Sequence, residues 1–388
     1  MSTAPRGNWN YPTSIRFGAG RVAELPAVLG ELGIRRPLLI TDPGLVNLAP
    51  VKDTLALLTA AGLPTGVFSE LRGNPNGKNV VDGVAAFKAG EHDGVVALGG
   101  GSALDVAKAV AMMVGQTRDL FDYEDREDWF TRIDPAGMVP LVALPTTSGT
   151  GSEVGRASVI TDERDHTKKI IFHPKMQPAK VICDPALTLG LPRALTAWTG
   201  MDALSHLLEA WCAPSFHPLA DGVALEGMRL VHKGLLRAVA DGADLEARSW
   251  MMAASAMGAT AFQKGLGGMH ALAHPIGAVL DAHHGLTNAV LMPYVVAFNR
   301  DLIEERMAAL ARYLDLPGAD FGAALQWILD LRAALDIPHT IGALGVTAAH
   351  VDQLSAMAAE DPSAGGNPRP FGVEAARAVL EAALEGRL

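Results

Sequence analysis

Histidines and one aspartate gather in the middle third of this chain in a pattern that suits a metal ion. Asp202 and His206 lie four residues apart in GMDALSHLLEAW, and His270 and His274 repeat this spacing in GMHALAHPIGA. Residues four apart on a helix leave the same face one turn apart, so each pair can point at one place. His284 follows in DAHHGLTNA. The aspartate and three of these histidines would close one divalent metal site.

The alternative is that each histidine only satisfies a hydrogen bond near the core, which is the commoner role of a single buried histidine. The whole set favours metal binding, because two such pairs and a third histidine turn are all flanked by glycine and small apolar residues. Imidazole suits iron and zinc, while one carboxylate neutralises the ion only in part. Such a site would be strongly Lewis acidic.

Four segments resemble the iron-containing (group III) alcohol dehydrogenase family in order, spacing and composition: GGGSALDVAK (99–108), ALPTTSGTGSEV (143–154), TGMDALSHLLEAW (199–211) and GLGGMHALAHPIGAVLDAHHG (265–285). The match spans nearly the whole chain. It implies that the metal ligands are Asp202, His206, His270 and His284, and that His274 is the family's extra histidine near the metal. The family name suggests Fe²⁺. Zn²⁺ is the alternative, because these ligand types also suit zinc and intrinsic affinity favours it.

Length and charge agree with an enzyme of two domains. The chain has 388 residues, too many for one ordinary core, and a formal net charge of -10, which argues against nucleic-acid binding. Neither a leader pattern in MSTAPRGNWNYP nor a membrane span is found, so we expect a cytoplasmic protein. The two cysteines, Cys183 and Cys212, are too few for a disulfide framework and are expected to be buried thiols.

Hydrophobic patterns predict two kinds of domain. Strand and helix patterns alternate from PLLITD (37–42) to GVVALGGGS, which favours a parallel sheet with helices on both faces. Long helical segments follow from about residue 191, and the polar stretch 360–370 is predicted as a loop before the last helix. We therefore expect a Rossmann-like α/β NAD-binding domain over 1–188 and an all-α metal-binding domain over 189–388. The resemblance implies a dehydroquinate synthase-like superfold.

A glycine-rich turn is the second chemical signal. GVVALGGGSALDVAKAV predicts strand, tight turn and helix, and the helix N-terminus would offer free N–H groups to a phosphate. A glycine cluster alone is often only a turn, and this one is not GxGxxG. The resemblance implies that the turn holds the NAD(P) pyrophosphate, through Gly99, Gly100, Gly101 and Ser102, with Asp105 close by.

Further cofactor contacts are implied by the resemblance. Thr146, Thr147 and Thr150 would line the adenine and ribose side, whereas from the sequence alone PTTSGTGSE is a polar capping loop. Asn74 and Lys168 would also touch the dinucleotide, with Lys169 the alternative to Lys168.

Asp42 follows the first predicted strand. It could accept hydrogen bonds from a ribose 2'-hydroxyl and repel a 2'-phosphate, which favours NAD over NADP. The alternative is a simple Asp-Pro-Gly turn.

Together these features predict a metal-dependent, NAD-dependent alcohol dehydrogenase or aldehyde reductase, which passes hydride between the nicotinamide and the α-carbon of a small alcohol or aldehyde. His274 is the candidate proton relay, and His283 is either a second member or a surface histidine. Arg156 and Lys264 could pair with an anionic tail of the substrate, or else hold nearby carboxylates.

Two alternatives come from other classes: a dehydroquinate synthase-like lyase that uses NAD and a metal, and a non-catalytic scaffold. The lyase would need a glutamate and two histidines as metal ligands, whereas here Asp202 is followed by three candidate histidines. No ligand position is substituted, which argues against the scaffold. We expect a homodimer or larger homo-oligomer, with neither nucleic acid nor membrane as partner.

Overall fold

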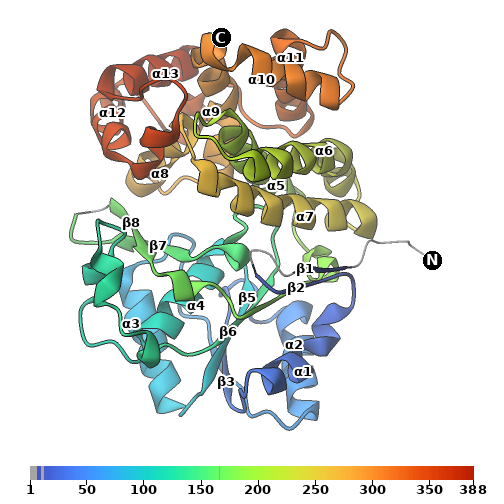
Figure 1. Ribbon diagram of the computed structural model, residues 1–388, viewed down its shortest axis with the longest axis vertical. Coiled ribbons are helices and arrows are strands. Elements are labelled where there is room, and N and C mark those ends of the chain that lie inside the picture. Colours follow the sequence, from blue (N-terminus) through green and yellow to red (C-terminus); the bar gives the residue numbers. More distant parts are fainter. Residues whose placement is uncertain (1–6, 10–12, 166) are drawn as a thin grey trace. The chain divides into compact units, whose positions relative to one another are not determined.

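A seven-stranded sheet lies at the centre of the first part of the chain (Figure 1). This computed structural model describes residues 7–9, 13–165 and 167–388. The chain divides into two units, Met1–Thr147 with Gly151–Leu191 and Ser148–Thr150 with Pro192–Leu388. In the sheet, β1 is antiparallel to β2 and all other neighbours are parallel. Its strands, in spatial order, are β1 (Gly7–Trp9), β2 (Ile15–Phe17), β9 (Lys180–Cys183), β6 (Leu141–Pro145), β5 (Gly94–Gly99), β3 (Pro37–Ile40) and β4 (Gly66–Phe68).

Helices cover both faces of this sheet. The central strands β3, β5 and β6 are buried at every residue, as strands covered on both sides must be. α1 (Leu25–Glu31) and α2 (Ala49–Ala60) pack on the face that carries Leu39 and Val96. α3 (Gly77–Ala89) and α4 (Gly101–Met113) cover the other face. The predicted parallel sheet between helices is confirmed.

Two β features were not predicted. The antiparallel edge strand β1 is one, and the separate hairpin of β7 (Ala157–Asp162) and β8 (Thr167–Phe172) is the other.

The second unit is helical throughout the part that the structure describes. Its first three helices match the long helical segments predicted from the sequence, and one continuous apolar core joins them to the rest. The helices are α5 (Arg193–Cys212), α6 (Pro218–Ala240), α7 (Leu245–Ala261), α8 (Gly268–Leu280), α9 (His284–Phe298), α10 (Arg300–Tyr313), α11 (Phe321–Ala334), α12 (Val351–Glu360) and α13 (Val373–Glu385).

A short piece of the earlier sequence belongs to this helical unit. Ser148–Thr150, from the PTTSGTGSE segment, groups with the helices, while the residues on either side of it group with the sheet. Gly149 lies against α5: a Cβ at this position would come within 2.8 Å of the Cβ and 2.9 Å of the carbonyl oxygen of Thr199. The main change of unit follows at Leu191 and Pro192. The chain therefore passes between the units three times.

The stretch predicted as a loop over 360–370 contains a short 3₁₀ helix, Pro362–Gly366, whose first turn is capped by the side chain of Asp361. Residues 1–6 and 10–12, on which the argument against a leader depends, lie outside the described residues. Among the helices described, none is both long and apolar enough to cross a bilayer.

Candidate metal and cofactor sites

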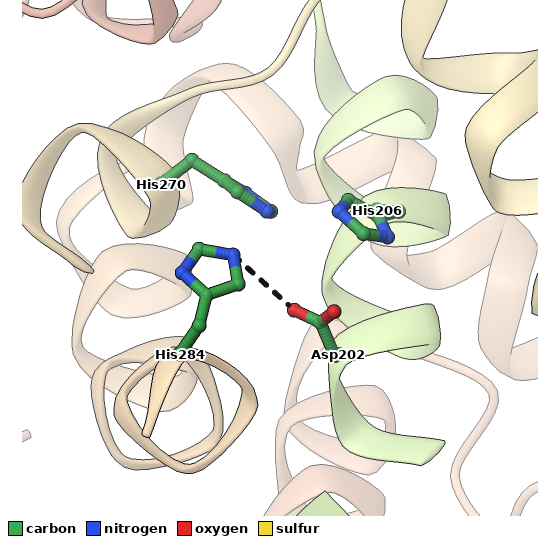
Figure 2. Close-up of side chains that lie close together, drawn as sticks. All are labelled: Asp202, His206, His270 and His284. Carbon is green, nitrogen blue, oxygen red and sulfur yellow. Dashed lines mark ion pairs between the residues drawn. The ribbon is translucent and has the colours of Figure 1, made fainter. Parts of the chain in front are cut away.

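Four side chains from three helices of the second unit point toward one another (Figure 2). Asp202 and His206 come from α5, His270 from α8 and His284 from α9, and one ligand atom from each lies within 4.8 Å of the others. Three imidazole nitrogens and one carboxylate oxygen this close together fit a single divalent ion of the iron or zinc type. These are the four residues that the family resemblance implies as ligands.

Local backbone geometry brings the third helix into place. Asp281 ends α8 in the left-handed conformation with φ 51°, so the chain turns back into α9 at once. Gly285 then lies so close to α5 that a Cβ there would come within 2.4 Å of the carbonyl oxygen of Trp198. This close approach allows Nε2 of His284 to lie 3.6 Å from Oδ1 of Asp202.

The cluster is buried, except at His284. Asp202, His206 and His270 are at most 5 % exposed, whereas the side chain of His284 is 25 % exposed. Burial lowers the pKa of His206 to about 4, which keeps this imidazole neutral, as a metal ligand must be. The accessible side of the cluster is therefore at His284.

Glu209, one turn beyond His206 on α5, contacts the cluster and was not among the candidates found from the sequence. Its Oε2 lies 2.5 Å from Nδ1 of His270, and its Oε1 accepts a hydrogen bond from the Met269 N–H at 2.7 Å. Burial would lower the pKa of His270, but the Glu209 carboxylate raises it above its usual value. With the proton held on Nδ1, Nε2 keeps its lone pair for an ion, a common arrangement around metal-bound histidines. No motif flags Glu209, because it lies in an apolar helical run.

His274 lies beside the cluster and is held by a second carboxylate. Its Nδ1 is 2.8 Å from Oδ2 of Asp361, and its ring stacks on that of His284 at a centroid distance of 5.4 Å and an angle of 10°. Burial opposes ionisation of Asp361, but the neighbouring His274 lowers the pKa of this carboxyl. His283 is exposed, and its ring nitrogen accepts the Leu286 N–H at the start of α9. This contact favours the surface interpretation of His283.

The glycine-rich turn in the first unit has the predicted form. β5 ends at Gly99 and α4 begins at Gly101, so the first N–H groups of α4 are presented beyond the strand end. Oδ2 of Asp42 accepts the Gly100 N–H at 2.8 Å, and burial raises the pKa of this carboxyl. Asp42, which follows β3, therefore stabilises the glycine-rich turn through this hydrogen bond.

Hydrogen bonds link several of the other predicted cofactor residues to the same turn or to the segment beside it. Ser102 donates to the carbonyl of Gly73, next to Asn74, at 2.6 Å, and the Thr146 N–H donates to the carbonyl of Gly99 at 2.9 Å. The Thr161 N–H donates to the carbonyl of Pro75. Thr161 lies opposite Lys168 in the antiparallel pairing of β7 with β8. Thr147 follows at the end of β6, and Thr150 belongs to the helical unit.

Two of the candidate residues differ in role from the others. Lys169 pairs with Asp165 at 2.8 Å, and Lys168 lies on the opposite side of β8. Both carboxylate oxygens of Asp105 bind within the chain, to the hydroxyl of Ser152 at 2.5 Å and the Val159 N–H at 2.9 Å. These bonds give Asp105 a structural function beside the turn.

The two predicted substrate cations differ in their surroundings. The Lys264 side chain is 0 % exposed, and its ammonium lies 2.5 Å from Oδ1 of Asp221 and 3.2 Å from the Trp211 carbonyl oxygen. Burial lowers the pKa of Lys264 despite this partner. This contact favours the alternative interpretation of Lys264, in which it pairs with a nearby carboxylate of the chain and not with a substrate. Arg156 is exposed, with its guanidinium 5.6 Å from the ring centroid of Phe172.

Comparison with known proteins agrees with this architecture. Residues 12–185 match the family model described as iron-containing alcohol dehydrogenase, and residues 196–384 match the C-terminal model of the Fe-containing alcohol dehydrogenase family. The 4-hydroxybutyrate dehydrogenase of Cupriavidus necator is 40 % identical over 385 residues, which cover 96 % of this chain and 99 % of that protein.

Solved structures give the same result. A crystal structure of a 1,3-propanediol oxidoreductase has a TM-score of 0.91 at 34 % identity and covers 99 % of this chain and 100 % of its own. Sulfoacetaldehyde reductase from Bifidobacterium kashiwanohense in complex with NAD+ has a TM-score of 0.86 at 28 % identity, with 99 % of both chains covered. The chain belongs to the iron-containing alcohol dehydrogenase family.

Proposed function

We propose that this protein is a metal-dependent, NAD-linked alcohol dehydrogenase that interconverts a small alcohol and its aldehyde. The observation that carries the proposal is the cluster of Asp202, His206, His270 and His284. A divalent ion held by these four side chains would supply Lewis acidity at the alcohol oxygen, and bound NAD would supply the hydride acceptor. Fe²⁺ is proposed from the family, with Zn²⁺ as the alternative.

The chain's own residues prepare the site. Glu209 fixes the ring of His270, and Asp361 keeps a proton on Nδ1 of His274, which leaves Nε2 of His274 to exchange a proton with the substrate or water. In the first unit, the backbone N–H groups at the start of α4 would bind the pyrophosphate. Asp42 would disfavour a 2'-phosphate by charge repulsion, which supports NAD over NADP.

The substrate class is proposed from charge. Two of the relatives are named for compounds with an acidic group, 4-hydroxybutyrate and sulfoacetaldehyde. Together with Arg156, an exposed residue, these names support a small substrate with an anionic tail. The Lys264 side chain is fully buried, which makes it the weaker of the two candidates.

The test is an assay of NAD reduction and NADH oxidation with Fe²⁺-loaded and Zn²⁺-loaded protein. Substrates would be 4-hydroxybutyrate and 1-butanol, which share chain length but differ in the carboxylate. His270→Ala and His284→Ala should lose both metal and turnover, whereas His283→Ala, the adjacent control, should keep both. Turnover that survives in either ligand variant would remove that residue from the site, and no turnover with either metal would contradict the proposal.

We also propose a homodimer or larger homo-oligomer in the cytoplasm. Light scattering coupled to gel filtration would test the assembly, since a monomeric mass would contradict it. Cell fractionation would test the location.

A further inference from the structure

A buried amide contacts three of the four side chains in the metal cluster. Asn288 lies on α9 one turn after His284 and is 0 % exposed. Its Nδ2 is 2.9 Å from Oδ1 of Asp202, 3.2 Å from Nε2 of His270 and 3.2 Å from Nε2 of His284. One amide group therefore lies where α5, α8 and α9 meet.

The surroundings decide which way this amide faces. A carbonyl oxygen placed 2.9 Å from the Asp202 carboxylate would be repelled, so the NH₂ group must face that oxygen. The other end of the amide, Oδ1, is buried and accepts no hydrogen bond from any residue in the described ranges. An unmatched buried acceptor costs stability, and leucine would fill the same space without that cost. The benefit of asparagine at this position must come from its NH₂ group.

We infer that Asn288 is a positioning residue of the metal site. Its NH₂ group donates to Oδ1 of Asp202 and holds that oxygen beside the converging nitrogens of His270 and His284. A bound ion would use the Nε2 lone pairs of His270 and His284. Of the three acceptors near the Asn288 NH₂ group, only the Asp202 carboxylate would then still accept a hydrogen bond. The hydrogen bond also withdraws negative charge from the carboxylate, which leaves a bound ion more Lewis acidic. This inference rests on the metal site of the proposed function.

The experiment is a Co²⁺ titration, because the visible absorption bands of Co²⁺ report its coordination geometry while chelator competition gives its affinity. Asn288→Leu removes the donor without adding charge. It should weaken Co²⁺ binding by about 10- to 100-fold and change the bands of the bound ion. Asn288→Asp has nearly the same shape, loses the donor and places a second carboxylate beside Asp202. It should change the bands as well, whatever its affinity.

Asn299→Leu is the matched control. Asn299 is a buried asparagine at the end of the same helix, but its amide pairs with that of Asn367. This variant should lose thermal stability and keep the wild-type Co²⁺ affinity and spectrum. Circular dichroism establishes that each variant folds, and Asn288→Asp decides the question if Asn288→Leu does not fold.

Wild-type affinity and an unchanged spectrum in the folded Asn288 variants would overturn the inference. If the wild-type protein itself binds no Co²⁺, the proposed metal site fails instead, so the two failures can be told apart.

Discussion

His270 and Glu209 form a buried pair in which Nδ1 of the imidazole lies 2.5 Å from Oε2 of the carboxylate. The same carboxylate accepts the Met269 N–H through its other oxygen. Glu209 thus fixes both the ring of a candidate metal ligand and the first turn of the helix that carries it.

Replacement of Glu209 by glutamine should weaken metal binding. Met269 and His270 bond to different oxygens of the carboxylate, and glutamine replaces one of these oxygens with an NH₂ group, which one of the two donors must then face. We expect a fall in metal affinity of about 10- to 100-fold, measured by chelator competition. The exposed Glu304→Gln should bind metal as the wild type does. Unchanged affinity in the Glu209 variant would show that the carboxylate only supports the helix.

Replacement of Asp42 by alanine should shift cofactor preference toward NADP. Removal of a carboxylate from the proposed ribose site removes the repulsion of a 2'-phosphate, so the ratio of kcat/KM for NADP to that for NAD should rise by about tenfold or more. The loss of the Gly100 hydrogen bond should weaken both cofactors, which is why the ratio is the quantity to measure. Asp53→Ala, on the exposed side of α2, is the control. A constant ratio would place the ribose elsewhere.

Arg156 and Lys264 should respond differently to replacement. Arg156→Ala should raise KM for 4-hydroxybutyrate by about tenfold and leave KM for 1-butanol unchanged, because a charge-assisted contact is lost only for the acid.

Lys264→Met leaves Asp221 with Arg306 as its remaining cation, at 3.2 Å, and should lower stability by about 1–3 kcal/mol.

Steady-state kinetics and thermal melting distinguish the two roles. The Lys264 variant should lose activity toward both substrates in the same proportion, if it loses any. A selective loss of the acidic substrate in this variant would restore Lys264 as a substrate residue.

Glu153 should make stability depend on pH. The residue is 1 % exposed, neither carboxylate oxygen has a hydrogen-bond partner in the described part of the chain, and burial raises its pKa to about 7 despite the nearby Lys108. The thiol of Cys183 also lies near this carboxylate. Between the ordinary glutamate pKa of 4.5 and about 7, the unfolded chain has released this proton and the folded chain has not. Stability therefore falls as pH rises through this window.

Glu153→Gln removes that effect. The variant should match the wild type near pH 4.5 and exceed it above pH 7 by on the order of 3 kcal/mol, as measured by denaturant unfolding at both pH values. Glu305→Gln, an exposed control, should show no such divergence. Equal stability of variant and wild type at high pH would mean that Glu153 is ionised without cost.

The sequence was most predictive where the spacing of the reactive side chains equals the repeat of the secondary structure that carries them. The spacing of Asp202 and His206 is a helical repeat, so the sequence alone assigns the pair to one face of α5. The glycine-rich turn was equally visible, because strand, glycines and helix are consecutive. Both features depend on neighbours within a few residues.

Partners that are distant in sequence could not be predicted in this way. Asp361 reaches His274 across 87 residues, and Asp221 reaches Lys264 across 43. Tertiary packing alone joins these pairs, and an isolated acidic residue on a helix or in a polar loop carries no sign of its partner. The hairpin of β7 and β8 was not predicted, although its strands ASVITD and TKKIIF are adjacent in sequence and contain β-branched residues.

The short segment Ser148–Thr150 makes the helical unit discontinuous in sequence. A fragment that begins at Pro192 would contain every metal-ligand candidate but not Gly149, whose backbone lies against Thr199 on the helix that carries Asp202 and His206. A truncation between Leu191 and Pro192 therefore does not isolate the complete helical unit. Gene fusions, domain exchanges between relatives and circular permutants need to carry residues 148–150 with the helices.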